Sequence, residues 1–178
     1  FLLKDLHLGN RSDADEKNQV DMRKGCFDKS DWKTWNGIAL WSKAWTEVIS
    51  VRYEKIRDSV AFRKQYLPRI AFVNIKKEAG GPSVCIKEIK DYADTQKEKI
   101  IEEIKLLNPD VIITCGTFDV AKIIFDYKES DIKKLELKNG GWRKKIRYFE
   151  NGKKLEFDKT VYVVEYRHPC MASYEKCF

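Results

Sequence analysis

The sequence predicts the α/β fold class, as a three-layer α/β/α sandwich around a mainly parallel central sheet. Short apolar runs that are typical of buried strands alternate with longer stretches in which apolar residues recur at helical spacing. This alternation indicates strand–helix–strand units, which build parallel sheets with helices on both faces. The chain of 178 residues has the size of one domain, and we expect residues 1–178 to form a single domain.

The first expected strand is the apolar run Phe1–Lys4. No start signal precedes it, so we expect the natural N-terminus to be truncated. The chain from Gly9 to Gly37 is polar and punctuated by turn-forming residues, which predicts a long loop. Apolar residues from Trp41 to Val60 then recur at helical spacing, and they predict an amphipathic helix that ends before Pro68.

Two further strand and helix pairs are expected in the middle of the chain. Ile70–Val73 reads as a strand that ends at Asn74, and the apolar stripe over Ile86–Leu107 predicts a helix. Val111–Cys115 reads as the next strand. Gly116-Thr117 then opens a third, shorter helix, as expected where a parallel strand is followed by its crossover.

A basic β-hairpin is expected as an insertion at about residues 139–158. Its predicted strands are Trp142–Phe149 and Lys154–Phe157, and Asn151-Gly152 between them is typical of a type I′ turn. The last predicted strand is Thr160–Tyr166.

Charge and cysteine content favour some classes of function over others. Lys and Arg number 35 against 28 Asp and Glu, so the net charge of +7 favours a polyanionic partner, although a solvated Lys-rich surface gives the same value. The five cysteines are an odd number without a CxxC pair, so we expect no disulfide framework, no metal and no cofactor. No apolar run approaches the roughly 18 residues of a transmembrane helix. We therefore expect a cytoplasmic (intracellular, soluble) monomer that does not contact membranes.

Polar residues stand where the predicted strands end. Right-handed crossovers place the C-terminal ends of parallel strands on one rim of the sheet, where ligands bind. Asp5, Asn74, Gly116 and, just beyond the last strand, His168 all belong to this rim. Asp and Asn are also turn formers, but an acid, an amide and an imidazole on one rim indicate a site.

Five motifs carry a resemblance to the uracil-DNA glycosylase superfamily, in order along nearly the whole chain. FLLKDLHLG at Phe1–Gly9 is similar to the apolar strand followed by GQDPYHG, and Gly25-Cys26-Phe27 to the GLCF stretch. IAFVN at Ile70–Asn74 resembles the LLLN strand. VIITCG at Val111–Gly116, followed by Thr117, resembles the strand and turn written LLWGS, and HPCMAS at His168–Ser173 resembles HPSPLS.

The resemblance implies a DNA glycosylase that hydrolyses the N-glycosidic bond of a flipped pyrimidine and leaves an abasic site. Asp5 would stabilise the oxocarbenium-like sugar and position the attacking water. His168 would donate a hydrogen bond to the carbonyl oxygen of the leaving base. Asn74 would read the Watson–Crick edge of the base, and Phe27 would stack on it, with Trp35 or Trp32 as substitutes.

Some residues differ from the family motifs. Lys4 stands in place of Gln, Leu6 in place of Pro, and His7 where a Tyr closes the pocket against 5-substituted bases. Ala172 replaces the wedge Leu, so Met171 is our candidate for filling the gap left in the base stack. DNA contacts are further expected from two motif residues and from the hairpin: Ser173, Thr117, Arg143, Lys144, Lys145, Arg147, Lys153 and Lys154.

The sequence leaves the base and the biological role open. The substrate is uracil or a modified pyrimidine, and the enzyme acts in DNA repair or as a defence glycosylase specific for modified cytosine in phage DNA. The alternative from another class is a DNA-binding or protein-interaction module that kept the fold and lost the reaction. Retention of Asp5 together with His168 argues against that alternative.

Overall fold

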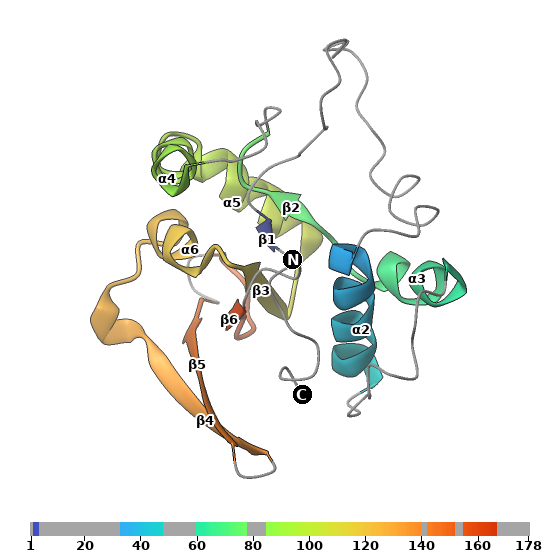
Figure 1. Cartoon of the computed structure of the whole chain (residues 1–178). Helices are drawn as coiled ribbons and strands as arrows, with labels where there is room; N and C mark the ends of the chain where they lie inside the picture. The colour runs from blue at the N-terminus through green and yellow to red at the C-terminus, as the bar shows by residue number, and fades with distance from the viewer. Residues whose placement is uncertain are drawn as a thin grey trace, which may run out of the picture. The chain divides into compact units, whose positions relative to one another are not determined.

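The computed structural model describes residues 2–3, 33–47, 60–77, 85–139, 142–151 and 155–166 (Figure 1). The chain divides into two compact units. The first unit comprises Phe1–Asn10 and Phe72–Tyr166, and the second comprises Arg11–Ala71 and Arg167–Phe178.

A six-stranded sheet organises the first unit, in the order β2-β1-β3-β6-β5-β4. The strands are β1 (Leu2–Leu3), β2 (Val73–Asn74), β3 (Val111–Cys115), β4 (Lys133–Asn139), β5 (Trp142–Glu150) and β6 (Tyr162–Tyr166). Neighbours among β2, β1, β3 and β6 run parallel, whereas β5 is antiparallel to both β6 and β4. The α/β class is therefore confirmed, with a mixed sheet.

The four parallel strands end level with one another. Leu3 of β1 pairs with Asn74 of β2, Leu2 pairs with Thr114 of β3, and Cys115 of β3 pairs with Tyr166 of β6. From β1 the chain goes outward to β2, returns past β1 to β3 and continues to β6. The direction of winding therefore reverses between β1 and β3, and such a reversal marks the place where open α/β sheets bind ligands.

Three helices cover one face of this sheet. They are α4 (Ile86–Thr95) and α5 (Lys97–Leu107) between β2 and β3, and α6 (Phe118–Ile124) after β3. Side chains from these helices form one core with side chains of the strands: Val73, Ile89, Ala93, Ile100, Ile104, Ile112, Ala121, Ile124, Phe149 and Val163. The single helix predicted over residues 86–107 is two helices that meet at Gln96, which has φ −106° and ψ 16°.

The hairpin lies earlier in the chain than predicted. β4 pairs with β5 from Lys133↔Tyr148 to Asn139↔Trp142, so the two-residue connection is Gly140-Gly141. The predicted second strand was wrong, because residues 155–156 form a turn. Leu155 is buried in the core there, and the backbone amide of Asn151 donates a 2.8 Å hydrogen bond to the backbone carbonyl of Val161. These contacts hold the segment against the sheet instead of extending it as a ribbon.

The second unit contains α2 (Lys33–Glu47), α3 (Val60–Tyr66) and the 3-10 turn η2 (Leu67–Arg69). α2 begins before Gly37, so the last part of the predicted loop is helical. The Ser42 hydroxyl donates a 2.8 Å hydrogen bond to the Tyr66 carbonyl, which joins α2 to α3. Among the helices that the structure describes in either unit, none is long and apolar enough to cross a membrane.

Candidate functional site

The described part of the predicted rim is the edge where β2, β1, β3 and β6 end. It carries Asn74 at the end of β2, Gly116 and Thr117 directly after β3, and Tyr166 at the end of β6. Eight predicted site residues lie outside the described residues: Asp5, His7, Phe27, Lys153, Lys154, His168, Met171 and Ser173. Their roles stay predictions.

The turn after β3 requires glycine. Gly116 has φ 73°, in the left-handed region that residues with a Cβ atom avoid. Its amide donates two hydrogen bonds of 2.8 Å, to the carbonyls of Thr114 and Tyr166. The Thr114 hydroxyl donates a further bond of 3.0 Å to the Val164 carbonyl. The ends of β3 and β6 are thus joined beyond the regular ladder.

Thr117 occupies the N-cap position of α6 and is buried. Its carbonyl accepts hydrogen bonds from the amides of Val120 (3.1 Å) and Ala121 (2.9 Å), which fixes the first turn of the helix. The predicted contact between Thr117 and DNA stays a prediction, and the structure places this residue beside the reversal of winding between β1 and β3.

Asn74 carries an uncommitted hydrogen-bond acceptor. The residue is half-buried, and its Oδ1 atom is buried and accepts no hydrogen bond from any residue that the structure describes. Val73 and Ile75 on either side point into the core, so strand alternation directs Asn74 to the other face of the sheet, away from α4, α5 and α6. Buried carboxamide oxygens usually accept a hydrogen bond, so this atom is available to a ligand that carries a donor.

Two lysines that were not predicted as site residues lie shortly after Asn74. Lys76 is buried and forms an ion pair with Glu88 of α4, and Lys77 forms one with Glu103 of α5. No sequence signal set them apart, because exposed lysines are abundant in this chain and a buried one depends on packing.

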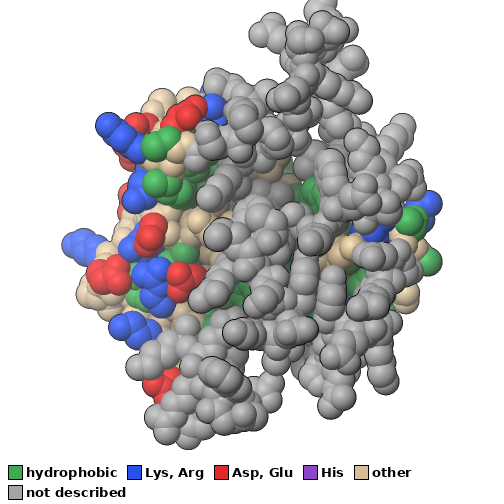
Figure 2. Space-filling view, in the orientation of Figure 1, with side chains coloured by type: hydrophobic (Ala, Val, Ile, Leu, Met, Phe, Trp, Pro, Cys, Tyr) green, Lys and Arg blue, Asp and Glu red, His purple; other side chains and the backbone are tan. Residues whose placement is uncertain are grey.

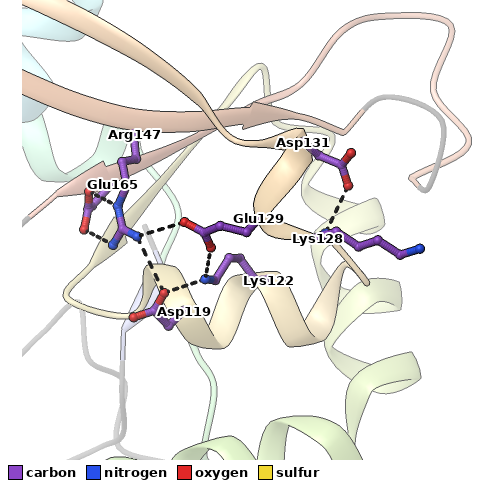
Figure 3. Close-up of polar contacts among 7 residues, drawn as sticks. All are labelled: Asp119, Lys122, Lys128, Glu129, Asp131, Arg147 and Glu165. Carbon is purple, nitrogen blue, oxygen red and sulfur yellow. Dashed lines mark hydrogen bonds and ion pairs between the residues drawn. The ribbon is translucent and has the colours of Figure 1, made fainter.

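Among the basic residues of the hairpin, the structure describes the side chain of Arg147 and the backbones of Arg143, Lys144 and Lys145. The backbones of Arg143, Lys144 and Lys145 on β5 pair with those of β4. Arg147, by contrast, is engaged within the protein, where its guanidinium donates 2.6 Å and 2.8 Å hydrogen bonds to both carboxylate oxygens of Glu165 (Figure 3). We therefore leave Arg147 out of the expected phosphate contacts.

A charged cluster surrounds Arg147. Its Nη1 atom lies 3.9 Å from an Asp119 oxygen and 4.0 Å from a Glu129 oxygen, and its Cζ atom lies 4.9 Å from the centre of the Phe118 ring. Lys122 bridges Asp119 and Glu129 at 2.9 Å and 3.0 Å (Figure 3). Acidic and basic side chains lie intermixed over the region of α4 and α6 in Figure 2. Opposite charges thus neutralise one another on this surface.

The electrostatics of the cluster follow from these contacts. The hydrogen bond from Lys122 holds the pKa of Asp119 below its ordinary value, with smaller help from the charge of Arg147. The same bond, with that to Glu129, raises the pKa of Lys122. The bidentate bond to Glu165 raises the pKa of Arg147 further above its ordinary value. All three groups therefore stay charged over the physiological pH range.

The cysteines in the described ranges do not form a metal site. Cys115 is buried in β3, and burial raises the pKa of its thiol to about 12, whereas Cys85 is exposed. No group of three His, Cys, Asp or Glu side chains within the described ranges is placed to hold a metal ion. Cys26, Cys170 and Cys177 lie outside those ranges, so the expected absence of a metal and of a cofactor stays a prediction.

Trp35, an alternative stacking residue, lies in α2 and is 4% exposed. It belongs to the buried part of the second unit, together with Ile38 and Trp41. Trp32 lies outside the described residues.

Comparison of the chain with protein-family models, curated proteins and solved structures gives no match.

Proposed function

We propose that this chain is a DNA glycosylase of the uracil-DNA glycosylase superfamily type, which hydrolyses the N-glycosidic bond of a flipped pyrimidine. The observation that carries the proposal is the reversal of winding between β1 and β3, at the rim to which the motif residues belong. Asp5 is the second residue after β1, and Thr117 is the second residue after β3. These two motif positions therefore follow the two strands that flank the preferred ligand site of an open α/β sheet.

The second catalytic position follows the next strand. His168 is the second residue after β6, which pairs with β3 along its whole length. Neighbouring strands lie about 4.8 Å apart, and β3 lies between β1 and β6. The ends of β1 and β6 are therefore roughly 10 Å apart. The motif resemblance assigns Asp5 and His168 to one nucleotide, and the ends of β1 and β6 flank the end of β3. Asn74, at the end of the strand next to β1, would contact the same nucleotide.

Burial along β3 supports the predicted three-layer sandwich. Ile112, Ile113, Thr114 and Cys115 are all buried, although consecutive strand residues point to opposite faces. Both faces of the central strand are therefore covered, as expected for parallel strands inside an α/β sandwich. The helices α4, α5 and α6 form the layer on one of these two faces.

The proposed reaction needs two charges to be stabilised. As the bond between the anomeric carbon and the base nitrogen breaks, the sugar becomes cationic and the base leaves with the electron pair as an anion. The Asp5 carboxylate stabilises the cation and orients the water whose oxygen bonds to the anomeric carbon. His168 donates a hydrogen bond to the base carbonyl, where negative charge collects. The proton lost by the water ends on the base or in solvent.

Base recognition is assigned to Asn74, Phe27 and His7. The uncommitted Oδ1 atom of Asn74 supports this role, because a carboxamide offers an acceptor and a donor to the Watson–Crick edge. Phe27 would stack on the base. His7 would line the side of the pocket near the pyrimidine 5-position, so we propose that polar 5-substituents are accepted as well as uracil.

DNA is the proposed partner, with Arg143, Lys144 and Lys145 of β5 contacting phosphates. β4 and β5 form a ribbon at one edge of the sheet, where Lys134 and Lys138 of β4 add further positive charge, whereas Lys133 is paired with Glu150. Lysines on an edge strand also prevent edge-to-edge aggregation. Binding measurements with hairpin variants separate these two roles.

The test is release of a free base. The full chain is incubated with single- and double-stranded oligonucleotides that carry one uracil, one 5-substituted pyrimidine or only normal bases. Free base is measured by mass spectrometry and abasic sites by alkaline strand cleavage. We expect release from at least one modified substrate and none from normal DNA. Binding to DNA without release from any substrate would instead support a non-catalytic DNA-binding module.

A further inference from the structure

We propose that Arg147 is a positioning residue that holds the end of β6 and the start of α6 in place at the rim. The inference builds on the proposed function, since the rim is where we place the reaction. It replaces the expectation that Arg147 contacts phosphate.

Arg147 lies at the junction of four segments. It stands on β5 opposite Glu165 of β6, and it contacts Phe118 and Asp119 of α6 and Glu129 of η3 (Glu129–Asp131). Its side chain is 28% exposed, so water screens these contacts only in part. The planar guanidinium matches both oxygens of the Glu165 carboxylate, which fixes orientation as well as distance.

Two of its acidic partners stand close to the rim. Glu165 pairs with Thr114, and the carbonyl of the next residue, Tyr166, accepts the hydrogen bond from Gly116. Asp119 is the second residue of α6, directly after Thr117 and Phe118. Arg147 therefore connects the strand on one side of Gly116 to the helix on its other side. Glu165 also precedes His168 by three residues, so the same contact fixes the point from which the His168 segment starts.

Within the described residues, Arg147 is the cation that is paired with Glu165. Asp119, Glu129 and Glu165 carry three negative charges, and the two cations that form ion pairs with them are Arg147 and Lys122. Lys122 pairs with Asp119 and Glu129, but the structure gives it no contact with Glu165 in the described ranges. Without Arg147, Glu165 would face like charges without a cation, and the link between β6 and α6 would be lost while that between α6 and η3 stayed.

The test compares four variants with a matched control. Arg147→Gln removes the positive charge, and Arg147→Lys keeps the charge but cannot bind both carboxylate oxygens at once. Glu165→Gln removes the negative charge of the partner of Arg147. The double variant Arg147→Glu with Glu165→Arg restores the pair in reverse. The control is Lys133→Gln, which removes the 2.7 Å ion pair between Lys133 and Glu150 on the same hairpin without touching the rim. Each protein is assayed for kcat and KM of base release.

We expect the three single variants at Arg147 and Glu165 to lower kcat about tenfold or more with KM changed by less than about twofold, because misplaced groups cost rate at constant affinity. The reversed pair should recover part of the loss, and Lys133→Gln should match wild type. A rise in KM at constant kcat would make Arg147 a DNA contact, and unchanged constants would make the pair purely structural. Either result overturns the proposal.

Hydrogen exchange makes the test independent of catalysis. In Arg147→Gln and Glu165→Gln, we expect faster amide exchange at residues 116–121 and 164–166, with exchange in α5 as in wild type. If wild type releases no base but this local change appears, the proposed function fails and the positioning role stands. Equal acceleration in α5 would indicate general destabilisation and would contradict the positioning role, as would unchanged exchange at the rim.

Discussion

The amide nitrogen of Gly116 lies 2.8 Å from the carbonyl oxygen of Tyr166, so the turn after β3 is hydrogen-bonded to the last residue of β6. Gly116 reaches this position with φ 73°. One backbone contact thus joins two of the strand ends on which the proposed site is built.

Gly116→Ala should lower the free energy of unfolding by about 1–2 kcal/mol, because a Cβ atom clashes with the backbone in the left-handed region. Gly116→Asn should cost less, since Asn tolerates that region better than Ala. Urea unfolding of the three proteins measures the difference. Equal stability of the Ala variant would show that the turn adopts another conformation.

Asn74→Leu should change the free energy of unfolding by less than about 1 kcal/mol, because the lost Oδ1 atom is buried without a hydrogen bond from the described residues. It should lower kcat/KM for base release about ten- to hundredfold, the effect of one or two lost hydrogen bonds to the base. Urea unfolding and steady-state kinetics supply the two values.

The matched control is Asn151→Leu. The side-chain nitrogen and oxygen of Asn151 are likewise buried without partners in the described ranges, but this residue follows β5 at the opposite end of the sheet. Its kcat/KM should equal that of wild type. Equal losses in both variants would contradict a role of Asn74 in base recognition.

Replacing Arg143, Lys144 and Lys145 together by Ala should weaken binding to every DNA and flatten its salt dependence. Each lost phosphate contact on duplex DNA lowers the slope of log K against log salt by about 0.9. Fluorescence anisotropy over a range of salt concentrations measures this slope. The control is the same loss of charge on α4 and α5, as Lys87, Lys90 and Lys99 to Ala, which should leave the slope closer to wild type. Equal slopes in the two triple variants would show that the hairpin contributes to DNA binding only as part of the general surface charge.

Stability at acid pH should depend on Asp119. The pKa of its carboxyl is lowered in the folded protein, so its contribution is present above the ordinary value of 3.8 and is lost as the pH falls through the lower folded-state value. Wild type should therefore lose more stability between pH 6 and pH 3 than Asp119→Asn, by about 1 kcal/mol or less for so exposed an ion pair. Urea unfolding at the two pH values gives this difference, and identical losses would contradict the ion pair.

Local signals account for the elements that were predicted well. β3 was predicted to the residue, because five apolar or β-branched residues stand between Pro109 and Gly116. The break at Gln96 could not be predicted, since the buried positions Ile89, Ala93, Ile100 and Ile104 keep one helical stripe across it. The start of α2 was predicted too late in the chain. Consecutive residues near its true start are buried, so they show no amphipathic pattern.

Long-range contacts account for what was missed. Gly140-Gly141 and Asn151-Gly152 are comparable hairpin signals, and the packing of Leu155 into the core decides between them. Arg147 looked like a phosphate contact because its partner Glu165 lies 18 residues away along the chain. Among the candidate site residues, the structure places Asn74 and Thr117 at the predicted rim, while the eight in the undescribed segments stay predictions.

Single-turnover base release with Asp5→Asn, on a DNA that wild type cleaves, tests the proposed glycosylase reaction. The carboxylate acts mainly in the transition state, so the rate should fall by about a hundredfold or more while the Kd for the same DNA changes by less than about twofold. His168→Ala should lose rate on a similar scale, about a hundredfold, if it stabilises the leaving base. An Asp5→Asn protein that releases base at the wild-type rate would contradict the proposed mechanism.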